Sequence, residues 1–317
     1  MSTVVVTGAA GFIGGQISLQ LRDAGHRVVG IDRRYYPNHL AGVFERYIHN
    51  DFASDHAFNA LIQERPEAII HCAATSLVGP SIKWPADYYN NNTVKTHRML
   101  DIVIQAIPKT RIIFSSTAAV YGDPIMVPCH EVDPKEPINP YGESKLMTEM
   151  MLGSYNKAYD LDYVAFRYFN ACGADSLGRH GEEADGTHII SRLVECIRDK
   201  KKFELFGNDY PTEDGTCVRD YVHVEDIARA HLMALDREKI PAGVYNLGSN
   251  QGTSNHEIIM AVQQVTTLLP EIQVGPRRPG DPATLTASSD QFDATAGVWR
   301  RWNLNDMIRH TWEWYNR

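Results

Sequence analysis

The stretch VVVTGAAGFIG, residues 4–14, decides the fold of this chain. A short run of β-branched residues leads directly into three glycines, and apolar residues at helical spacing follow. In such a strand–turn–helix unit, Gly8 permits the tight turn, Gly11 lets a pyrophosphate approach the backbone, and Gly14 lets the helix pack closely on the strand. The amino terminus of the helix then faces the phosphates with its partial positive charge. The stretch therefore predicts a dinucleotide-binding βα unit.

Short apolar runs alternate with amphipathic helical patterns through the first half of the chain. A long helix is expected around residues 86–107, and another begins at Asn139-Pro140, where Asn can cap the helix and Pro suits its first turn. Apolar strands that alternate with such helices indicate a parallel sheet buried on both faces. The predicted fold class is α/β, with a Rossmann-like doubly wound parallel sheet. The runs expected as strands are 4–7, 28–31, 68–71, 111–114 and 163–167.

The pattern loosens after about residue 170, and a second lobe is expected there. No linker rich in Ser, Gly or Pro separates the two halves, and there is no internal repeat. We expect residues 1–170 to form the dinucleotide-binding domain, with a segment around 221–232 returning to it. Residues 171–317 are expected to form mainly a smaller C-terminal α/β lobe for the substrate. Later helices are expected at about 187–199, 224–235, 254–267 and 303–315.

Composition excludes several classes of protein. The 317 residues are 43% apolar and 22% charged, as in ordinary globular proteins, and the net charge of -8 argues against general nucleic-acid binding. No run approaches the ~20 apolar residues of a membrane helix, and we expect neither a signal peptide nor a membrane partner. The five cysteines are scattered without a Cys-x-x-Cys pair. We therefore expect reduced thiols, a cytoplasmic protein and no metal site.

An acidic residue, Asp32, follows the second predicted strand. A carboxylate there accepts hydrogen bonds from both hydroxyls of an adenosine ribose and repels a 2′-phosphate, which favours NAD over NADP. Arg33 and Arg34 are an opposing signal, because Arg can receive that phosphate, although a solvated loop is the simpler interpretation. We expect NAD as the cofactor.

Tyr141 and Lys145 are four positions apart and therefore share one face of a predicted helix. A nearby ammonium stabilises a phenolate and lowers the pKa of the tyrosine, which can then take a proton from an alcohol as hydride leaves the carbon. The predicted strand before this helix ends in hydroxyl side chains, at the sheet edge where open α/β folds bind ligands. Ser116 or Thr117 could hydrogen-bond the same substrate oxygen as Tyr141, and spacing does not choose between them.

Together these motifs resemble the extended short-chain dehydrogenase/reductase superfamily and, within it, the UDP-glucose 4-epimerase (UDP-galactose 4-epimerase) family. The resemblance runs through essentially the whole chain, and its most specific part is the stretch 206–231, which plain dehydrogenases of the superfamily lack. The matching stretches are VTGAAGFIG (6–14), SSTAAVYG (115–122), PYGESKLMTE (140–149), RYFNACGAD (167–175), FGNDYPTEDGTCVRDYVHVEDIARAH (206–231), YNLGS (245–249) and RRPGDPA (277–283).

The resemblance implies a role for each matching residue. It makes Tyr141 the base and acid, Lys145 the residue that tunes it, and Thr117 the hydrogen-bond partner of the sugar hydroxyl. The implied NAD contacts are Gly8, Gly11, Phe12, Ile13, Gly14, Asp32, Asp51, Phe52, Ala73, Ala74, Asn92, Tyr141, Lys145 and Tyr168. The implied UDP-sugar contacts are Thr117, Asn170, His188, Phe206, Arg219, Arg278 and Asp281. Without the resemblance, ion pairs with Asp220 and Asp281 explain the two arginines equally well.

The activity that the resemblance implies is the interconversion of UDP-glucose and UDP-galactose in galactose metabolism. NAD oxidises carbon 4, the 4-keto sugar turns about its diphosphate link, and the hydride returns to the other face. The resemblance also implies a homodimer built from the helices at about 86–107 and 141–159. Ser76 stands where well-known members often carry a Lys against the cofactor, which implies weaker or more exchangeable NAD.

Three other functions stay open. The first is a 4-epimerase of another UDP-sugar, such as UDP-GlcNAc, UDP-GalNAc or a UDP-pentose, because Leu285 lies near the position that limits room for an N-acetyl group and is of intermediate size. The second is a sugar-nucleotide dehydratase, but those families place an acid directly after the strand-end hydroxyl, where this chain has Ala118 and Ala119. The third is a non-catalytic NAD sensor, for which loss of Tyr141 or Lys145 would be expected.

Overall fold

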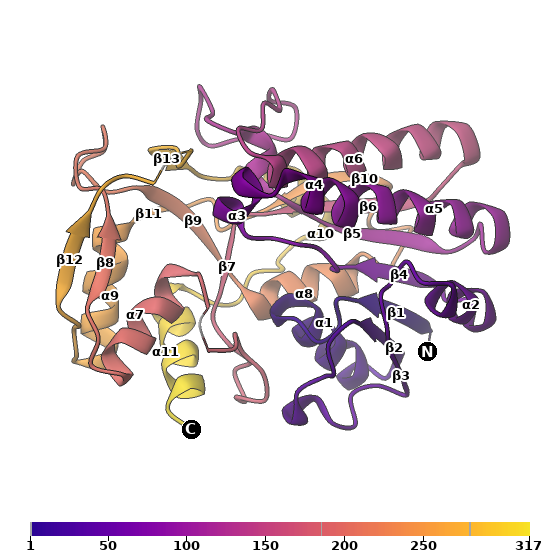
Figure 1. Cartoon of the computed structure of the whole chain (residues 1–317), viewed down its shortest axis with the longest axis horizontal. Coiled ribbons are helices and arrows are strands. Elements are labelled where there is room, and N and C mark those ends of the chain that lie inside the picture. Colours follow the sequence, from indigo (N-terminus) through magenta and orange to yellow (C-terminus); the bar gives the residue numbers. More distant parts are fainter. Residues whose placement is uncertain (1, 185, 279) are drawn as a thin grey trace. The chain divides into compact units, whose positions relative to one another are not determined.

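The chain folds into two units, each with its own core. The computed structural model describes residues 2–184, 186–278 and 280–317 (Figure 1). The first unit comprises Met1–Gly122, Lys135–Arg167 and Ala228–Tyr245. The second unit comprises Asp123–Pro134, Tyr168–Ile227 and Asn246–Arg317.

A seven-stranded sheet carries the first unit, with the strand order β10-β6-β5-β4-β1-β2-β3. Its strands are β1 (Thr3–Thr7), β2 (Arg27–Asp32), β3 (Arg46–His49), β4 (Ala68–His71), β5 (Arg111–Thr117), β6 (Tyr163–Tyr168) and β10 (Gly243–Leu247). The strands from β1 to β5 pair in parallel. The order reverses between β1 and β4, and in such sheets ligands bind beyond the carboxyl ends of the strands at that point. The predicted doubly wound parallel sheet is confirmed.

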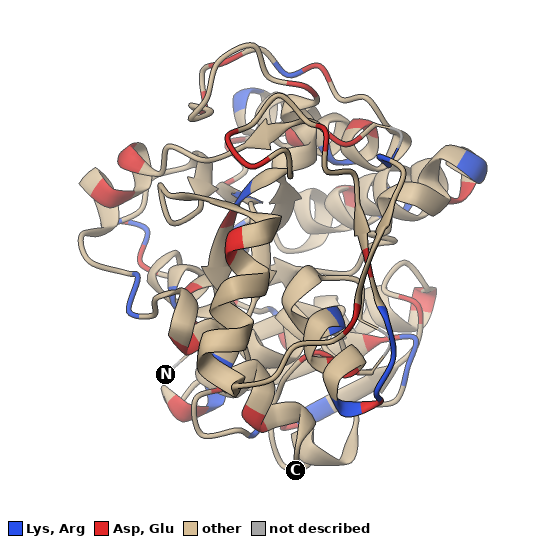
Figure 2. Cartoon of the chain, turned by 90° about the vertical axis from the view of Figure 1, so that its left-hand side faces the viewer, with Lys and Arg blue, Asp and Glu red and all other residues tan. Residues whose placement is uncertain are grey.

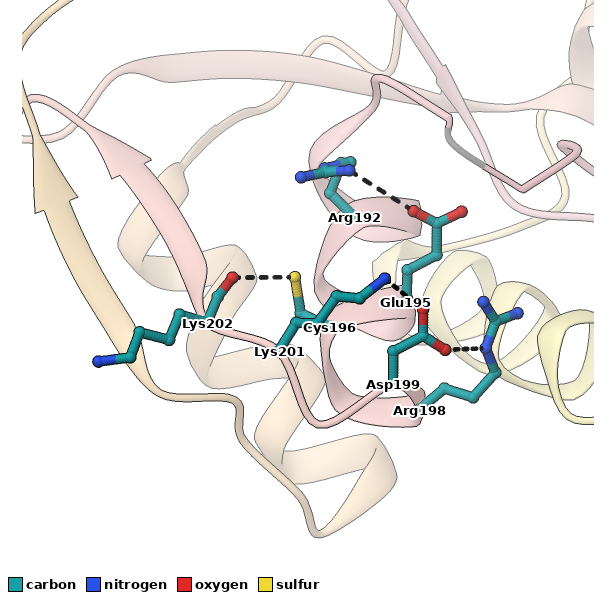
Figure 3. Close-up of a pocket in the computed structure, with 7 residues that line it drawn as sticks. All are labelled: Arg192, Glu195, Cys196, Arg198, Asp199, Lys201 and Lys202. Carbon is teal, nitrogen blue, oxygen red and sulfur yellow. Dashed lines mark hydrogen bonds and ion pairs between the residues drawn. The ribbon is translucent and has the colours of Figure 1, made fainter.

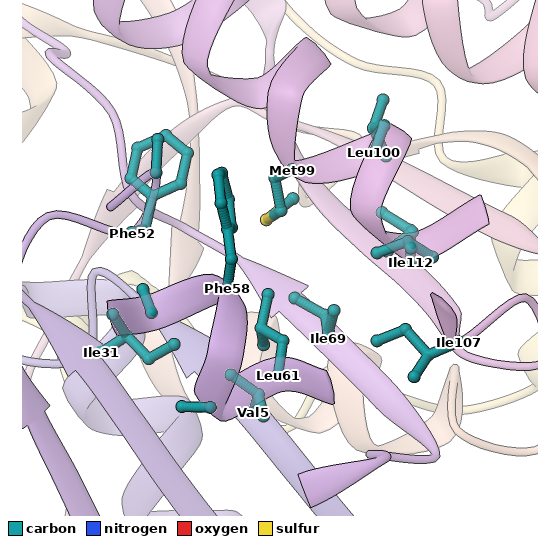
Figure 4. Close-up of a cluster of buried hydrophobic side chains, with 14 of the residues drawn as sticks. Val5, Ile31, Phe52, Phe58, Leu61, Ile69, Met99, Leu100, Ile107 and Ile112 are labelled. Atoms are coloured by element: carbon teal, nitrogen blue, oxygen red, sulfur yellow. The ribbon is translucent and has the colours of Figure 1, made fainter. Parts of the chain in front are cut away.

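One apolar cluster holds the helices on this sheet (Figure 4). Val5, Ile69 and Ile112 from the strands meet Leu61 of α2 and Leu100 of α5, and all five side chains are fully or almost fully buried. Each such side chain contributes ~1.5–3 kcal/mol when it is fully buried. The helices and short turns of this part of the chain are α1 (Phe12–Asp23), η1 (Asn38–Leu40), α2 (Asp55–Glu64), α3 (Val78–Lys83), α5 (Lys95–Ala106), η3 (Ala118–Tyr121) and α6 (Pro140–Tyr159).

The longest helix, α6, forms where its capping residues predict it. The Asn139 side chain accepts a hydrogen bond from the backbone N–H of Gly142 at 2.9 Å, and Pro140 occupies the first turn. The helix ends at Asp160, whose φ of 55° lies in the left-handed region. Since cap and first turn both agree with the sequence, the start of α6 is set locally.

The long helix expected around 86–107 forms, but it is not a regular α-helix throughout. The helical backbone runs without a break through α4 (Pro85–Tyr88), a π-helical segment η2 (Tyr89–Val94) and α5. The wide π turn places Asn91 and Asn92 inside the protein, where both amide groups donate hydrogen bonds to Thr75. The regular α-helical pattern is interrupted because these buried amides need partners in the loop after β4.

The second unit combines short strands with a helical layer. Strand β9 (Val218–His223) pairs with β7 (Asn170–Cys172) and β13 (Thr284–Leu285) in parallel and with β11 (Gly252–Ser254) antiparallel. Strands β8 (Phe203–Phe206) and β12 (Ile272–Gly275) form a separate parallel pair. The helices of this unit are α7 (Ile189–Arg198), α9 (Asn255–Thr266), α10 (Asp290–Ala296) and α11 (Leu304–Tyr315), and α8 (Val224–Met233) crosses the boundary between the units. One apolar cluster includes Leu193, Val262 and Ile308, from α7, α9 and α11.

The boundaries of the units differ from the expected ones in two segments. The segment that rejoins the first unit is Ala228–Tyr245, whereas 221–232 was expected. The loop Asp123–Pro134, expected in the first domain, belongs to the second unit. The reason is local pairing, because the backbone of Cys129 exchanges hydrogen bonds of 2.8 Å with Thr286 and Ser288.

Charged residues of both signs are interspersed along the chain. Figure 2 shows Lys and Arg interspersed with Asp and Glu on the side that it faces. Among the residues that the structure describes, no helix has the length and apolar character needed to cross a bilayer. Because charges of both signs are mixed in this way, a small anionic ligand has to be recognised by a few individual side chains and backbone N–H groups.

Candidate active site

The glycine turn after β1 has the space and polarity to hold a pyrophosphate. Gly8 has a φ of +70°, and a Cβ on it would lie 2.7 Å from the backbone nitrogen of Ala73, in the loop after β4. A Cβ on Gly14 would collide with the carbonyl of Gly8. Helix α1 begins after Gly11 with no side-chain cap and no acidic residue in its first turn. Because no acidic side chain neutralises the amino terminus of α1, its partial positive charge can stabilise an anion such as the pyrophosphate of a dinucleotide. The first helical residues, among the expected NAD contacts, are Phe12, Ile13 and Gly14.

Asp32 is fixed at the carboxyl end of β2 by the same turn. One carboxylate oxygen accepts from the backbone N–H of Ala10 at 3.1 Å, and the other accepts from the N–H of Arg34 at 2.9 Å. The Arg34 guanidinium donates to the carbonyl of Ala10 at 2.9 Å, so it is tied to the turn. The Arg34 guanidinium also lies 4.0 Å from the Asp32 carboxylate, so both side chains stand at the turn, and the role of Asp32 as the ribose acceptor stays a prediction.

The other expected cofactor contacts lie in loops at the carboxyl edge of the sheet. Asp51 forms an ion pair with Lys95. Burial alone would raise the pKa of Asp51, but the hydrogen bond from Lys95 brings it below its ordinary value. Phe52 is buried and packs edge-on against His71, with 4.8 Å between ring centres. Both Ala73 and Ala74 follow β4 directly and are half-buried.

Asn92 links the loop after β4 to helix α6. Its side-chain oxygen accepts from the N–H of Thr75 at 2.8 Å, and its amide donates to the Thr75 carbonyl and to the Ser144 hydroxyl at 2.9 and 3.0 Å. Ser144 in turn donates to the carbonyl of Tyr141 at 2.8 Å. Ser144 was not singled out in the sequence, although it lies between Tyr141 and Lys145. The role of Asn92 toward NAD stays a prediction, while its role as a link is visible.

Tyr141 and Thr117 are brought together. Tyr141 stands in the first turn of α6 next to Thr117, the last residue of β5, whose side chain acts on the pKa of the phenol. Burial raises the pKa of Tyr141, the Thr117 side chain opposes this shift, and the neighbouring Tyr88 adds to it. The ring of Tyr88 meets that of Tyr141 edge-on, with 6.5 Å between ring centres, and no sequence pattern predicts this contact.

Ser116, the alternative to Thr117, faces the interior. Its side chain is 2% exposed, and its hydroxyl donates to Glu149 at 2.5 Å. Thr117 is only half-buried. Since the Ser116 hydroxyl is turned to Glu149, Thr117 is the one of the two that lies beside Tyr141.

The Lys145 side chain is buried against β5. Its ammonium is 3% exposed, donates to the carbonyl of Ser115 at 2.7 Å and lies 4.7 Å from the ring centre of Phe114. Burial lowers the pKa of Lys145 to about 8, and the nearby Cys72 and Glu149 oppose the shift.

The effect of Lys145 on the pKa of Tyr141 stays a prediction. In this structure burial raises the pKa of Tyr141. The Lys145 ammonium donates to the Ser115 carbonyl although the two side chains share a helix face.

In the second unit, Arg219 and Asp281 pair with each other. Arg219, on β9, donates to the Asp281 carboxylate and to the carbonyls of Pro282 and Ala283 at 2.7, 2.7 and 3.3 Å. Asp220 does not join this pair, because its carboxylate accepts from the backbone N–H groups of 249, 250 and 287. The expected ion pair of an arginine with Asp281 is thus present, formed by Arg219, whereas the one expected with Asp220 is wrong.

Phe206, Arg278 and Asn170 occupy separate positions in the same unit. The Arg278 guanidinium lies 3.9 Å from the centre of the Phe206 ring, as in a cation–π contact, and has no carboxylate partner among the described residues. Asn170, at the start of β7, donates to the carbonyl of Asp220 at 3.1 Å. Arg278 is therefore held flat by an aromatic ring while its N–H edge stays available to a phosphate.

His188 carries a positive charge more readily than an ordinary histidine. It precedes α7, and its Nδ1 lies 2.7 Å from Glu182, which also accepts from Ser191. Burial would lower the pKa of His188, but the hydrogen bond to Glu182 raises it above the ordinary value. Tyr168, the remaining expected NAD contact, is buried at the end of β6.

A small surface pocket near the end of α7 is not the candidate site (Figure 3). Its lining is polar, and Asp199 pairs there with both Arg198 and Lys201 at 2.8 and 3.0 Å. Arg192 pairs with Glu195, and Lys202 pairs with Glu271 outside the lining, so each charged side chain of the pocket has a partner. None of the expected site residues lines it.

Comparison with known proteins identifies the family. The profile of the NAD dependent epimerase/dehydratase family matches residues 4–248. The chain belongs to this family. It is 40% identical to the UDP-glucose 4-epimerase of Halalkalibacterium halodurans, over 98% of this chain and 95% of that protein. The structure of UDP-glucose 4-epimerase from Brucella ovis with NAD has a TM-score of 0.92, with 36% identity, covering 99% of this chain and 98% of that one. The enzyme from Bifidobacterium longum, with NAD+ and UDP, has a TM-score of 0.92, with 31% identity and the same coverage.

Membership of the NAD dependent epimerase/dehydratase family agrees with the glycine turn and Asp32, which fit a dinucleotide. No cluster of three or more His, Cys, Asp and Glu side chains able to hold a metal ion occurs among the described residues.

Replacement of Lys145 should change how stability depends on pH. The unfolded chain holds the lysine proton up to pH ~10.5 and the folded chain only up to about 8, so the buried lysine destabilises the fold at neutral pH and progressively less above pH 8. We expect the gain in unfolding free energy of Lys145→Met over the parent to be about 2–3 kcal/mol larger at pH 7 than at pH 10. Urea unfolding of the protein without added nucleotide measures both values.

The matched control is Lys157→Met, on the exposed side of the same helix. Its difference from the parent should be equal at the two pH values. An equally pH-independent difference for Lys145→Met would contradict the buried, low-pKa lysine.

Proposed function

We propose that this chain is a UDP-glucose 4-epimerase, which interconverts UDP-glucose and UDP-galactose with NAD. The observation that carries the proposal is the Thr117–Tyr141 pair at the carboxyl end of β5, beside the buried Lys145. Full-length similarity to curated UDP-glucose 4-epimerases supports the choice of substrate. Ala118 and Ala119 supply no acid for the elimination of water, which supports epimerisation over dehydration.

The first unit provides the proton chemistry. Tyr141 takes the proton of the 4-hydroxyl as the C4–H bond breaks, and it returns a proton when that bond forms again. Thr117 holds the same oxygen through its hydroxyl. NAD, when bound, supplies the acceptor for the hydride of carbon 4 and gives this hydride back to the opposite face. Lys145 fixes the helix that carries Tyr141 against β5.

The second unit provides the grip on the nucleotide. Arg278 is the stronger candidate for the diphosphate, because Arg219 already donates to Asp281 and to neighbouring carbonyls. His188, with its raised pKa, adds positive charge, and Phe206, Asn170 and Asp281 complete the proposed UDP contacts. A firm hold on UDP and a loose hold on the sugar permit the 4-keto sugar to turn. Arg219 then acts mainly by holding the segment 281–283.

The proposal extends to a homodimer. Apolar side chains stay exposed on η2 and α6, where Val94, Met147 and Met150 are 52%, 42% and 65% exposed. Such exposed apolar groups on neighbouring helices suit a self-complementary surface for a second copy of the chain. The five free cysteines agree with a cytoplasmic place for the enzyme, in galactose metabolism.

Loss of the Tyr141 hydroxyl should abolish most of the activity. We expect Tyr141→Phe to lower kcat for UDP-galactose by roughly 10³-fold, because a positioned acid and base contributes about 10²–10⁴-fold. Binding of UDP should change little, since the nucleotide contacts lie elsewhere. The control is Tyr159→Phe, on the exposed last turn of the same helix, which should keep full activity.

A coupled assay for UDP-glucose measures both variants, and absorbance at 340 nm tests for net NADH. A Tyr141→Phe variant that keeps the kcat of the parent would contradict the proposed role of Tyr141. Stoichiometric NADH release by the parent would indicate a dehydrogenase.

A charge on the exposed face of α6 should break the dimer. We expect Met150→Asp to sediment as a monomer of about half the parent mass, because a buried unpaired carboxylate is costly. The control is Met126→Asp, at a residue that is 68% exposed and lies outside these helices, and this variant should stay dimeric. A dimeric Met150→Asp, or a monomeric parent, would refute this interface.

A further inference from the structure

A buried ion pair lies behind the Thr117–Tyr141 pair and has no part in the proposed chemistry. Glu149 of α6 and Arg167 of β6 have side chains that are 5% and 3% exposed. The guanidinium donates from Nε and Nη2 to the carboxylate at 3.0 and 2.6 Å. Burial would lower the pKa of Arg167, but Glu149 raises it well above its ordinary value, so the guanidinium stays charged. A buried pair of this kind adds little net stability, because desolvation offsets the attraction.

The pair reaches both ends of one short segment. The Ser116 hydroxyl donates to Glu149 at 2.5 Å, and Nη1 of Arg167 donates to the Tyr121 hydroxyl at 2.8 Å. The guanidinium also lies 5.0 Å from the centre of the Tyr121 ring. The pair therefore holds residues 116 and 121 at fixed distances from α6 and β6.

The segment between these two residues carries Thr117. Thr117 caps the turn η3, and its Oγ1 accepts from the N–H of Ala119 at 3.2 Å. A Cβ on Gly142 would come within 2.5 Å of the Ala119 carbonyl, so the first turn of α6 rests directly on η3. Any shift of the segment 116–121 thus changes the geometry between Thr117 and Tyr141.

We propose that Glu149 and Arg167 are positioning residues of the reaction, which act through Ser116 and Tyr121 to hold Thr117 against Tyr141. The inference rests on the proposed epimerase function. Glu149 lies two helical turns from Tyr141 on the same helix, so one side chain locks α6 to β5 while its partner locks the far end of η3 to β6. The four residues touch neither the proton nor the hydride.

The test removes single hydroxyl groups and leaves the ion pair intact. Ser116→Ala and Tyr121→Phe each cut one link to the segment. Because misplacement of a reacting group by a fraction of an ångström is costly, we expect kcat for UDP-galactose to fall roughly 10-fold in each variant, with KM within about twofold. The double variant should lose much less than the product of the two effects, since both links hold one segment.

The matched control is Thr110→Val. Thr110 is also a buried hydroxyl, 3% exposed, and precedes the other end of β5, where it donates to the carbonyl of Pro66 at 2.8 Å. This variant should keep kcat within about twofold of the parent. Thermal unfolding of all the variants shows whether they are equally folded at the assay temperature.

The isotope effect of deuterium at carbon 4 separates positioning from general loss of structure. We expect it to rise in Ser116→Ala and Tyr121→Phe, because a misplaced Thr117–Tyr141 pair makes the chemical step slower relative to binding and release. An unchanged kcat in both variants overturns the proposal. Equal losses in Thr110→Val, or losses of kcat that follow the fraction unfolded, also overturn it. A parent that does not convert UDP-galactose refutes the proposed function instead.

Discussion

The hydrogen bond from the buried Lys145 ammonium to the Ser115 carbonyl fixes the rest of the candidate active site. It joins α6 to β5 at the strand's carboxyl end. With this contact in place, the next two residues of the strand meet the same helix one turn to either side. Ser116 donates to Glu149, and Thr117 lies next to Tyr141. Three consecutive residues of β5 thus each contact one residue of α6, and the three helix residues are four positions apart. The position of β5 along α6 therefore sets the geometry of the candidate site.

Much of this arrangement is predictable from local signals. The glycine turn, the Asn139 cap and the apolar strands each obey a short-range rule, and each forms where the sequence indicates. The choice between Ser116 and Thr117 is not predictable in this way. It depends on which face of β5 meets α6, and that is decided by the whole sheet. The direction of the Lys145 side chain has the same origin, because its partner is a backbone carbonyl of the strand.

The π-helical segment within the helix expected at 86–107 shows a second limit of sequence patterns. Its apolar spacing is helical, but the buried amide of Asn92 must bond to Thr75 and Ser144. These partners are distant in sequence, so the π turn that accommodates them leaves no periodic trace. The loop Asp123–Pro134 follows the same logic, since its assignment to the second unit depends on pairing with residues near Thr286. For Arg219, competition among nearby acceptors decided the partner, and composition alone could not rank them.

The proposed reaction requires that the same hydride leaves carbon 4 and returns to it within one enzyme. UDP-galactose carrying deuterium at carbon 4, incubated with the protein and NAD, tests this requirement directly when the product is analysed by NMR and mass spectrometry. We expect UDP-glucose that keeps the deuterium at carbon 4, with no net NADH. A product that has lost the deuterium to solvent or to released reduced cofactor would contradict it.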